Sequence, residues 1–330
     1  MATEKHYSTW LAKRLLPFSP KPNAQRKPRR EPLMSGTTES LSRKIAGAND
    51  LQGVVRSMKA LAASSIGQYE KAVQSLDSYY RTVELAITAC LRPAAPEPLA
   101  ESRSLRRGVA VGAILFGSDQ GLVGRFNEVL LECATNQLKA LPGKTMKIWA
   151  IGDRIQALVA DSGLAPSSLL SVPTSVDAIT SFVGQILVEI EQARERGDVT
   201  EVYVFHNHPT AGTFYEPVCK RLLPLDLSWQ KKIASLPWPT KTLPEIIESM
   251  VPALAAFIRE YLFVLLFQAC AESLASENAS RLAAMQRAEK NIEDILDDLN
   301  RTFHRIRQET IDEELFDVIS GFDALTARHV

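Results

Sequence analysis

Two long stretches near the ends of this 330-residue chain space their apolar residues three and four positions apart. In the first stretch the spacing passes almost without fault through Leu41, Ile45, Ala48, Leu51, Val55, Met58, Ala62, Ile66, Tyr69, Val73, Leu76, Tyr80, Val83 and Ile87. A repeat of 3.5 residues predicts a helix that winds around a partner along a narrow apolar seam. We place this helix at residues 38–92, and its part from about residue 40 to residue 91 would be roughly 75 Å long at 1.5 Å per residue. Three prolines after Leu91 would end it.

The second stretch covers residues 243–327, and between Pro252 and Gly321 it contains neither proline nor glycine. Its apolar positions are Ile258, Leu262, Leu265, Ala269, Leu282, Met285, Ile292, Leu299, Phe303 and Ile306. We expect a second long helix, with a kink or a restart at Pro252. A long helix with a narrow apolar seam needs a partner, so the two helices are predicted to wrap around each other as an antiparallel coiled coil.

Residues 106–228 have a different pattern. The short apolar runs GVAVGAILFGSD, KIWAIGD and EVYVFHNHP alternate with amphipathic stretches, and Gly or Asp bounds most of them. Alternation of strand and helix is typical of a parallel sheet covered by helices. The predicted fold class is therefore α/β plus coiled coil, in which a small Rossmann-like parallel-sheet domain is inserted between the two long helices.

Composition excludes some functions and leaves the role of residues 1–37 undecided. The formal net charge is zero, which gives no basic field for binding nucleic acid. The four cysteines lie far apart without metal-ligand spacing, as expected of buried thiols in a reducing compartment. Residues 1–37 are basic and proline-rich, and we expect them to be disordered. A targeting peptide, a surface-binding arm and a start site at Met34 remain alternatives for this segment.

Two short motifs suggest chemistry. In FHNHPT (residues 205–210), His206 and His208 resemble the zinc ligands of JAMM metalloproteases, which also need a Ser and an Asp shortly downstream. Glu216 and Cys219 stand at about those positions instead, so we expect no third ligand and interpret the motif as a turn after an edge strand. GSDQGLVGRFN (residues 117–127) is a weak candidate for a phosphate-binding turn, because it matches neither GxGxxG nor a Walker lysine pattern.

Three segments together carry a resemblance to a known family. They are KIAGANDLQGVVRSMKALAAS, LFGSDQGLVGRFN and SLASENASRLAAMQRAEKNIEDILDDLNRTFHRIRQETIDEELFDVISGFDAL. In this order they resemble the gamma subunit of F-type ATP synthases, over nearly everything from Ser40 to Leu325. The resemblance implies a central rotor shaft with no catalytic site and no cofactor of its own. Nucleotide and magnesium would bind to the alpha and beta subunits.

The resemblance also implies subunit contacts. Arg56, Met58 and Lys59 match the basic and Met positions that in the family lie near an acidic loop of the beta subunits. Arg281 and Met285 match the signature Arg and Met of the C-terminal helix.

Higher on the same helix, Arg307 and Gln308 match the Arg-Gln pair that contacts beta loops in the family. The chain departs from the family at Val123 and Arg125, where the turn usually reads GLCGGFN, and the family's Tyr-Glu-Pro stretch before the last helix is missing. These departures favour a divergent bacterial version over a mitochondrial one.

The implied partners are the alpha and beta subunits, the epsilon subunit and the membrane c-ring, at the inner face of the bacterial cell membrane. No nucleic acid is expected. Two other functions remain open at this point. One is a coiled-coil scaffold protein with an α/β head, and the other is a zinc hydrolase that uses His206 and His208.

Overall fold

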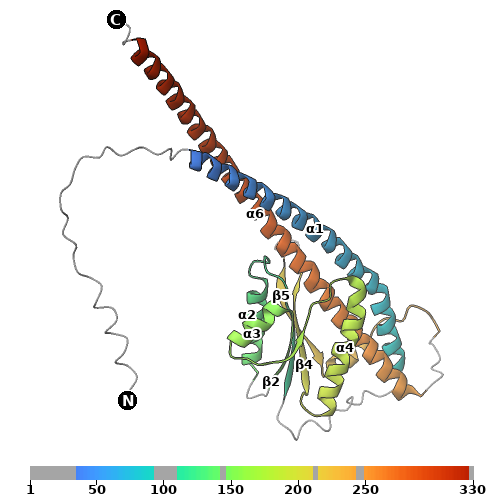
Figure 1. Cartoon of the computed structure of the whole chain (residues 1–330). Coiled ribbons are helices and arrows are strands. Elements are labelled where there is room, and N and C mark those ends of the chain that lie inside the picture. The colour runs from blue at the N-terminus through green and yellow to red at the C-terminus, as the bar shows by residue number, and fades with distance from the viewer. Residues whose placement is uncertain (1–34, 93–109, 142–145, 211–214, 243–248, 327–330) are drawn as a thin grey trace, which may run out of the picture. The chain divides into compact units, whose positions relative to one another are not determined.

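The computed structural model describes residues 35–92, 110–141, 146–210, 215–242 and 249–326 (Figure 1). These residues fall into two compact units. One unit comprises residues 45–298, and the other contains residues 35–44 and 299–326. Helices α1 (Ser35–Leu91) and α6 (Met250–Thr326) contribute to both units.

The larger unit contains a five-stranded sheet in the order β3-β2-β1-β4-β5. The strands are β1 (Val111–Phe116), β2 (Met146–Ile151), β3 (Pro166–Leu170), β4 (Glu201–His208) and β5 (Glu216–Leu223). Neighbouring strands from β3 through β4 run parallel, but β5 pairs antiparallel with β4. The predicted α/β fold is confirmed, but the sheet is mixed rather than all-parallel. The link between β4 and β5 is too short for a crossover, which takes a dozen or more residues.

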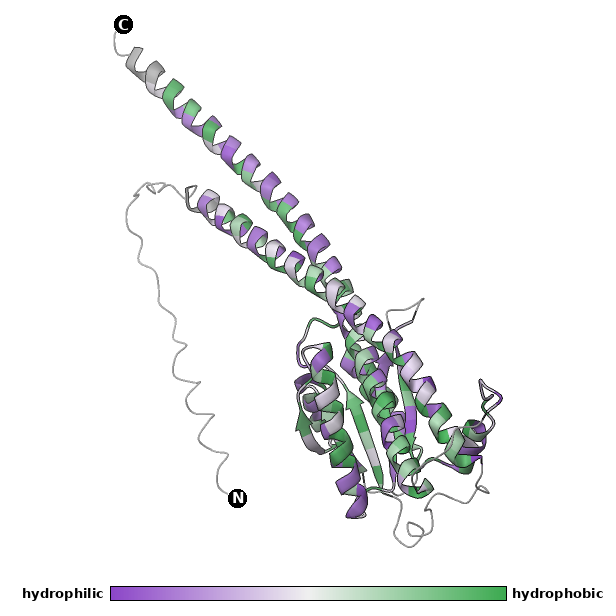
Figure 2. Ribbon diagram, turned by 90° about the vertical axis from the view of Figure 1, so that its right-hand side faces the viewer, coloured by the Kyte–Doolittle hydropathy of each residue, from purple (hydrophilic) through white to green (hydrophobic). Residues whose placement is uncertain are grey.

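Helices cover both faces of the sheet. Ile114 and Phe116 of β1 join the core cluster formed with α1, α4 (Val176–Glu195), α5 (Leu227–Ala234) and α6. The alternate residues of β1 join a second cluster, built with α2 (Phe126–Lys139) and α3 (Asp153–Asp161). Successive side chains of a strand point to opposite faces, so a strand buried on both sides is apolar throughout, as β1 is. Figure 2 shows the apolar strands between their helices.

Within residues 45–298, α1 lies along α6 in the antiparallel direction (Figures 1 and 2). Tyr80 stacks on Tyr261 with ring centroids 5.7 Å apart, and Gln52 donates a 3.5 Å hydrogen bond to Glu293. Moving back along α1 therefore means moving forward along α6. The seam is apolar, with Tyr69, Ala72, Val83 and Ile87 of α1 buried in the same cluster as Leu262, Leu266 and Ala269 of α6. The predicted antiparallel coiled coil is confirmed.

The helix ends differ slightly from the sequence-based ranges. Helix α6 begins two residues before Pro252, so this proline falls in the first turn, where helix N–H groups have no partner within the helix. Gly321 does not interrupt α6. Residues 1–34, 106–109, 243–248 and 327, on which other predicted boundaries fall, lie outside the described residues.

Helix α6 also contains an 18-residue stretch that, by length and a mean hydropathy of 1.8, is apolar enough to cross a membrane. In this stretch 22% of the residues are buried in the structure. Leu262 and Leu266 pack into the core of the larger unit, so core packing accounts for part of the apolar character of α6.

Candidate partner-binding surfaces and a buried polar cluster

A group of four charged side chains joins α1 to α6. Arg56 donates from Nε to Glu289 Oε1 at 2.9 Å, and one of its terminal nitrogens lies 3.7 Å from Glu293. Lys59 Nζ lies 2.5 Å from the other carboxylate oxygen of Glu289. Hydrogen bonds from Lys59 and Arg56 hold the pKa of Glu289 below its usual range. Both predicted contact cations are therefore held by α6, although the side chain of Arg56 remains 57% exposed.

Met58 belongs to an exposed apolar stripe on α1. Leu51, Val54 and Leu61 are 60%, 56% and 68% exposed, and Met58 is half-buried. Their spacing of three, four and three residues places all four side chains on one face of the helix. Large exposed apolar side chains that gather on one face indicate a protein-binding surface. The sequence repeat had placed Leu51 on the seam, whereas the structure exposes it.

Met285 and Arg281 lie inside the larger unit. Met285 is 2% exposed, and the Arg281 side chain is 12% exposed. Arg281 forms an ion pair with Glu277 one turn earlier and donates to the Asn278 side chain at 3.1 Å. Burial raises the pKa of Glu277, and the Arg281 guanidinium acts in the opposite direction. Neither Met285 nor Arg281 offers much surface to another chain.

The glycine-rich turn at residues 117–127 is held by side chains of its own and of its neighbours. Ser118 N–H donates to the Asn127 side chain at 3.0 Å, and the Asn127 amide donates back to Ser118 Oγ at 2.9 Å. The carboxylate of Asp119 accepts from Asp153 N–H at 3.1 Å and from Val172 N–H at 3.0 Å. The Asp119 carboxylate therefore lies at the start of α3, and the polar side chains of the turn are engaged in holding the local structure together.

Three serines of α6 attach this helix to the sheet. Ser273 Oγ donates to the Phe116 carbonyl at 2.9 Å and Ser276 Oγ to the Asn207 carbonyl at 3.0 Å. Ser280 Oγ donates to the Val123 carbonyl. Small hydroxyl side chains at this spacing let α6 approach the strand ends closely, which explains the SLASENAS segment.

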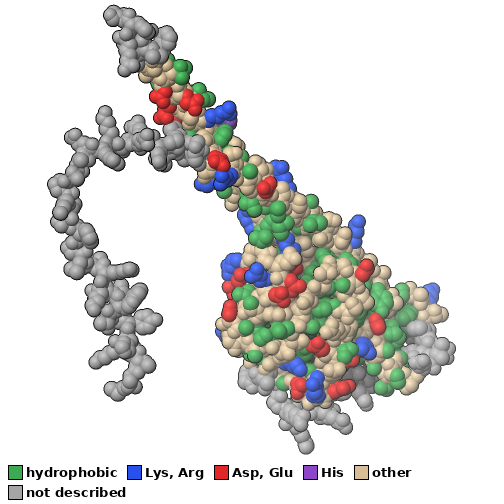
Figure 3. Space-filling model, in the orientation of Figure 1, with side chains coloured by type: hydrophobic (Ala, Val, Ile, Leu, Met, Phe, Trp, Pro, Cys, Tyr) green, Lys and Arg blue, Asp and Glu red, His purple; other side chains and the backbone are tan. Residues whose placement is uncertain are grey.

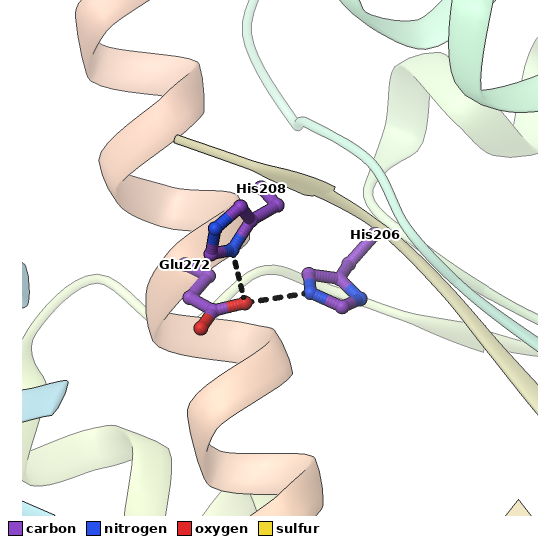
Figure 4. A group of neighbouring side chains, drawn as sticks. All are labelled: His206, His208 and Glu272. Carbon is purple, nitrogen blue, oxygen red and sulfur yellow. Dashed lines mark hydrogen bonds and ion pairs between the residues drawn. The ribbon is translucent and has the colours of Figure 1, made fainter. Parts of the chain in front are cut away.

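The FHNH motif lies inside β4, which is next to the edge strand β5, so interpreting it as a turn after an edge strand was wrong. His206 Nε2 lies 2.8 Å and His208 Nδ1 2.9 Å from the same oxygen of Glu272, a residue of α6 (Figure 4). Burial lowers the pKa of His206, against the effect of its contact with Glu272. Burial alone would raise the pKa of Glu272, but hydrogen bonds from both histidines bring it to about 2. The expectation of no third potential ligand was also wrong.

In the smaller unit, the end of α6 carries a second exposed apolar stripe. Arg307 and Gln308 are exposed, and beyond them follow Ile311, Leu315, Phe316, Val318 and Ile319, all between 48% and 70% exposed. Ile311, Leu315, Val318 and Ile319 share one helix face by their spacing. Figure 3 shows apolar side chains along this part of α6. The spacing of these residues is visible in the sequence, but it was not among the predicted contacts.

Comparison with known proteins assigns the chain to a family. The model of the ATP synthase family matches residues 37–325. The chain belongs to the ATP synthase gamma family. It is 28% identical over 295 residues to the ATP synthase gamma chain of Polynucleobacter asymbioticus, covering 88% of this chain and 99% of the relative. The gamma chain of Cupriavidus necator is also 28% identical, over 301 residues that cover 88% and 100% of the two chains.

Solved structures show the same fold as this gamma chain. A chain of the Euglena gracilis mitochondrial ATP synthase (OSCP/F1/c-ring, rotational state 3) matches with a TM-score of 0.59 and 15% identity, covering 89% of this chain and 96% of that one. A chain of the rotor of the same synthase in rotational state 1 matches with a TM-score of 0.57 and 14% identity, over 84% and 99%. The resemblance inferred from the sequence is confirmed, and the protein is the central-shaft subunit of an ATP synthase.

Proposed function

We propose that this gamma chain transmits rotation between a membrane c-ring and the alpha and beta subunits, has no catalytic site of its own, and also binds the epsilon subunit. It would work at the inner face of a bacterial cell membrane, where ion flow through the ring is coupled to ATP synthesis or hydrolysis. The observation that supports this role most directly is the antiparallel pairing of α1 and α6 along a buried apolar seam. A packed two-helix seam resists twisting, as a shaft must.

We assign the contact with the catalytic subunits to the face of α1 that carries Met58, Arg56 and Lys59. The apolar stripe around Met58 is exposed in the free chain, which favours a partner that covers it. Each angle of the shaft would present this face to a different catalytic subunit. A contact that favours one conformation of that subunit over another couples the shaft angle to its state.

The charged residues refine this assignment. Arg56 and Lys59 share one carboxylate, Glu289, so an acidic loop of a neighbouring subunit would compete with Glu289 for them. The side chain of Arg56 is 57% exposed, so water screens its attraction to either partner. Exchange between two such partners thus has little energetic cost, which suits a contact that forms and breaks in every turn.

Arg307 and Gln308 are proposed as a second contact, because both are exposed and are followed by the apolar stripe at the end of α6. Met285 and Arg281 receive a supporting role instead. Their burial allows them to hold the seam and the neighbouring turn of α6 while touching partners little.

Membranes that contain the chain provide the test. Purification through a tag on this chain should recover alpha, beta, epsilon and c subunits, identified by mass, and the preparation should pump ions when ATP is added. Recovery of the chain without those subunits would instead support the scaffold alternative.

A Met58→Lys variant tests the assigned face, because it places a charge in the apolar stripe. We expect assembly and ATP hydrolysis to persist while ion pumping per ATP falls by at least half. A Leu169→Lys variant is the matched control, because Leu169 is 69% exposed on β3 and lies outside both stripes. Normal pumping efficiency in Met58→Lys would refute the assignment of this face.

A further inference from the structure

The cluster of His206, His208 and Glu272 has no part in the shaft function described above. We infer that these three side chains form a binding site for one divalent transition-metal ion, with zinc as the expected ion, that fastens β4 to α6. Their potential ligand atoms, one from each residue, all lie within 4.8 Å of one another. Figure 4 shows both imidazole rings directed from β4 at the carboxylate of α6.

The local structure explains why three residues distant in sequence converge. His206 and His208 stand two positions apart on β4, so their side chains emerge on the same face of the strand. That face is the one covered by α6, because Val202 and Val204 of the same strand alternation are buried in the cluster that includes α6. Glu272 lies on the inner side of α6, one position before Ser273, which donates to the sheet.

The donor set suits a transition metal. Two imidazoles and one carboxylate with a position left open are typical ligands of zinc. Imidazole also binds copper, nickel and iron, whereas magnesium and calcium prefer oxygen ligands. The alternative is a hydrogen-bonded cluster without a metal ion, in which both rings donate to Glu272 Oε2.

The observed distances need only a small adjustment. Ligand atoms around a tetrahedral zinc at 2.0–2.1 Å lie about 3.3 Å apart. The two nitrogen–oxygen contacts of 2.8 and 2.9 Å would therefore lengthen by about 0.5 Å. The side chain of His208 is 43% exposed, so it can move and it leaves a route for the ion and for a water ligand.

A fourth residue, Gln268, orients the carboxylate of Glu272. Gln268, one turn before Glu272 on α6, donates to the other carboxylate oxygen, Oε1, at 2.7 Å. This hydrogen bond fixes the carboxylate with Oε2 directed at both rings. Partners that orient a metal ligand in this way typically change metal affinity 10- to 100-fold. Lys220 on β5 is close enough to lower the pKa of both His206 and Glu272, so its positive charge opposes the binding of a cation at this site.

The experiment measures zinc in the assembled complex of this chain with its alpha and beta partners. The complex is stripped with a chelator, exposed to Zn²⁺, freed of excess ion and analysed for zinc per gamma chain. We expect wild type to retain one equivalent more than His208→Gln and Glu272→Gln. Cobalt in place of zinc should give visible absorption bands in wild type that His208→Gln loses. A Gln268→Met variant should bind zinc 10- to 100-fold more weakly.

Two controls keep the test decisive. His304→Gln removes an exposed histidine far along α6 and should leave the zinc content unchanged. His208→Gln decides the result if a change at the buried His206 prevents folding, because His208 is partly exposed. Equal zinc in wild type, His208→Gln and Glu272→Gln would overturn the inference and leave a hydrogen-bonded network only. If the chain does not assemble with those partners, the same measurement on the full chain alone decides the metal question separately.

Discussion

Replacing Met285 by Ala should lower the folding stability of the gamma chain, whereas the coupling of ATP hydrolysis to ion pumping should not depend on this side chain directly. Met285 is 2% exposed, so truncation removes buried methylene groups and the sulfur and leaves a cavity in the region where α1 and α6 pair. Changes from Met to Ala in cores cost about 2–5 kcal/mol. We expect a value within this range, because Met285 is almost fully buried. Met58→Ala, at a half-buried position, should cost about half as much or less.

The assay is urea unfolding of the full chain, followed by pumping and hydrolysis measurements on the assembled complex. Met285→Leu keeps the volume and should restore stability to within about 1.5 kcal/mol of wild type. A complex that contains Met285→Leu should pump ions normally. If Met285→Ala unfolds with a free energy within about 0.5 kcal/mol of wild type, or if a stable Met285→Leu variant is uncoupled, the supporting role assigned to Met285 is wrong.

Three further predictions concern the coiled coil and two carboxylates, Asp226 and Asp119, which accept hydrogen bonds from backbone N–H groups at the starts of α5 and α3. Cysteines at Gln52 and Glu293, whose side-chain ends meet at 3.5 Å, should be joined by a short bis-maleimide cross-linker, whereas cysteines at Gln52 and Glu260 should not, because Glu260 contacts Tyr79 much farther along α1. Equal cross-linking of the two pairs, measured by gel mobility, would contradict the pairing. The pKa of Asp226 is lowered to about 2 by hydrogen bonds from the Ser228 hydroxyl and Trp229 N–H. Because this pKa is lower in the folded chain, the ionised carboxylate adds stability above about pH 4, and this stability is lost as the pH falls toward 2. The difference in unfolding free energy between wild type and Asp226→Asn should therefore shrink between pH 4 and pH 2 and stay constant from pH 5 to 7. Asp119→Ala leaves two backbone N–H groups without their acceptor and should cost about 1–3 kcal/mol, measured by urea unfolding against Asp119→Asn, which keeps one acceptor and should cost less.

The sequence predicted the paired helices well because the 3.5-residue repeat is a local property of each helix. It did not predict the register, which depends on contacts such as Arg56 with Glu289 between residues more than 200 positions apart. Leu51 shows the limit of the repeat. It keeps the seam spacing, yet the structure leaves it 60% exposed, so periodicity alone cannot separate a seam residue from a surface residue near the end of a contact.

The sequence did not indicate strands β3 and β5, and the reasons are physical. Strand β3 is only five residues long, and β5 begins with Glu216 and Pro217 and carries Lys220 and Arg221. Edge strands with charges and proline avoid pairing with other chains, and these same residues hide them from a search for apolar runs.

The polar cluster was missed for a different reason. His206 and His208 stand out in the sequence, but Glu272 lies 66 positions later in a helix rich in acidic residues. Only the packing of α6 across β4 distinguishes Glu272 from the exposed carboxylates of the same helix. Chemistry assembled from two distant elements therefore requires the tertiary structure.

The serine attachments of α6 have an evolutionary consequence. Ser273, Ser276 and Ser280 donate to main-chain carbonyls, so the acceptor side of each bond is independent of the side chains at Phe116, Asn207 and Val123. Residues on the sheet side can therefore drift while the joint survives, provided that the donors on the helix persist. Because only the helix side of these bonds depends on side chains, α6 could stay attached to the α/β domain even when the sequence of that domain changes extensively.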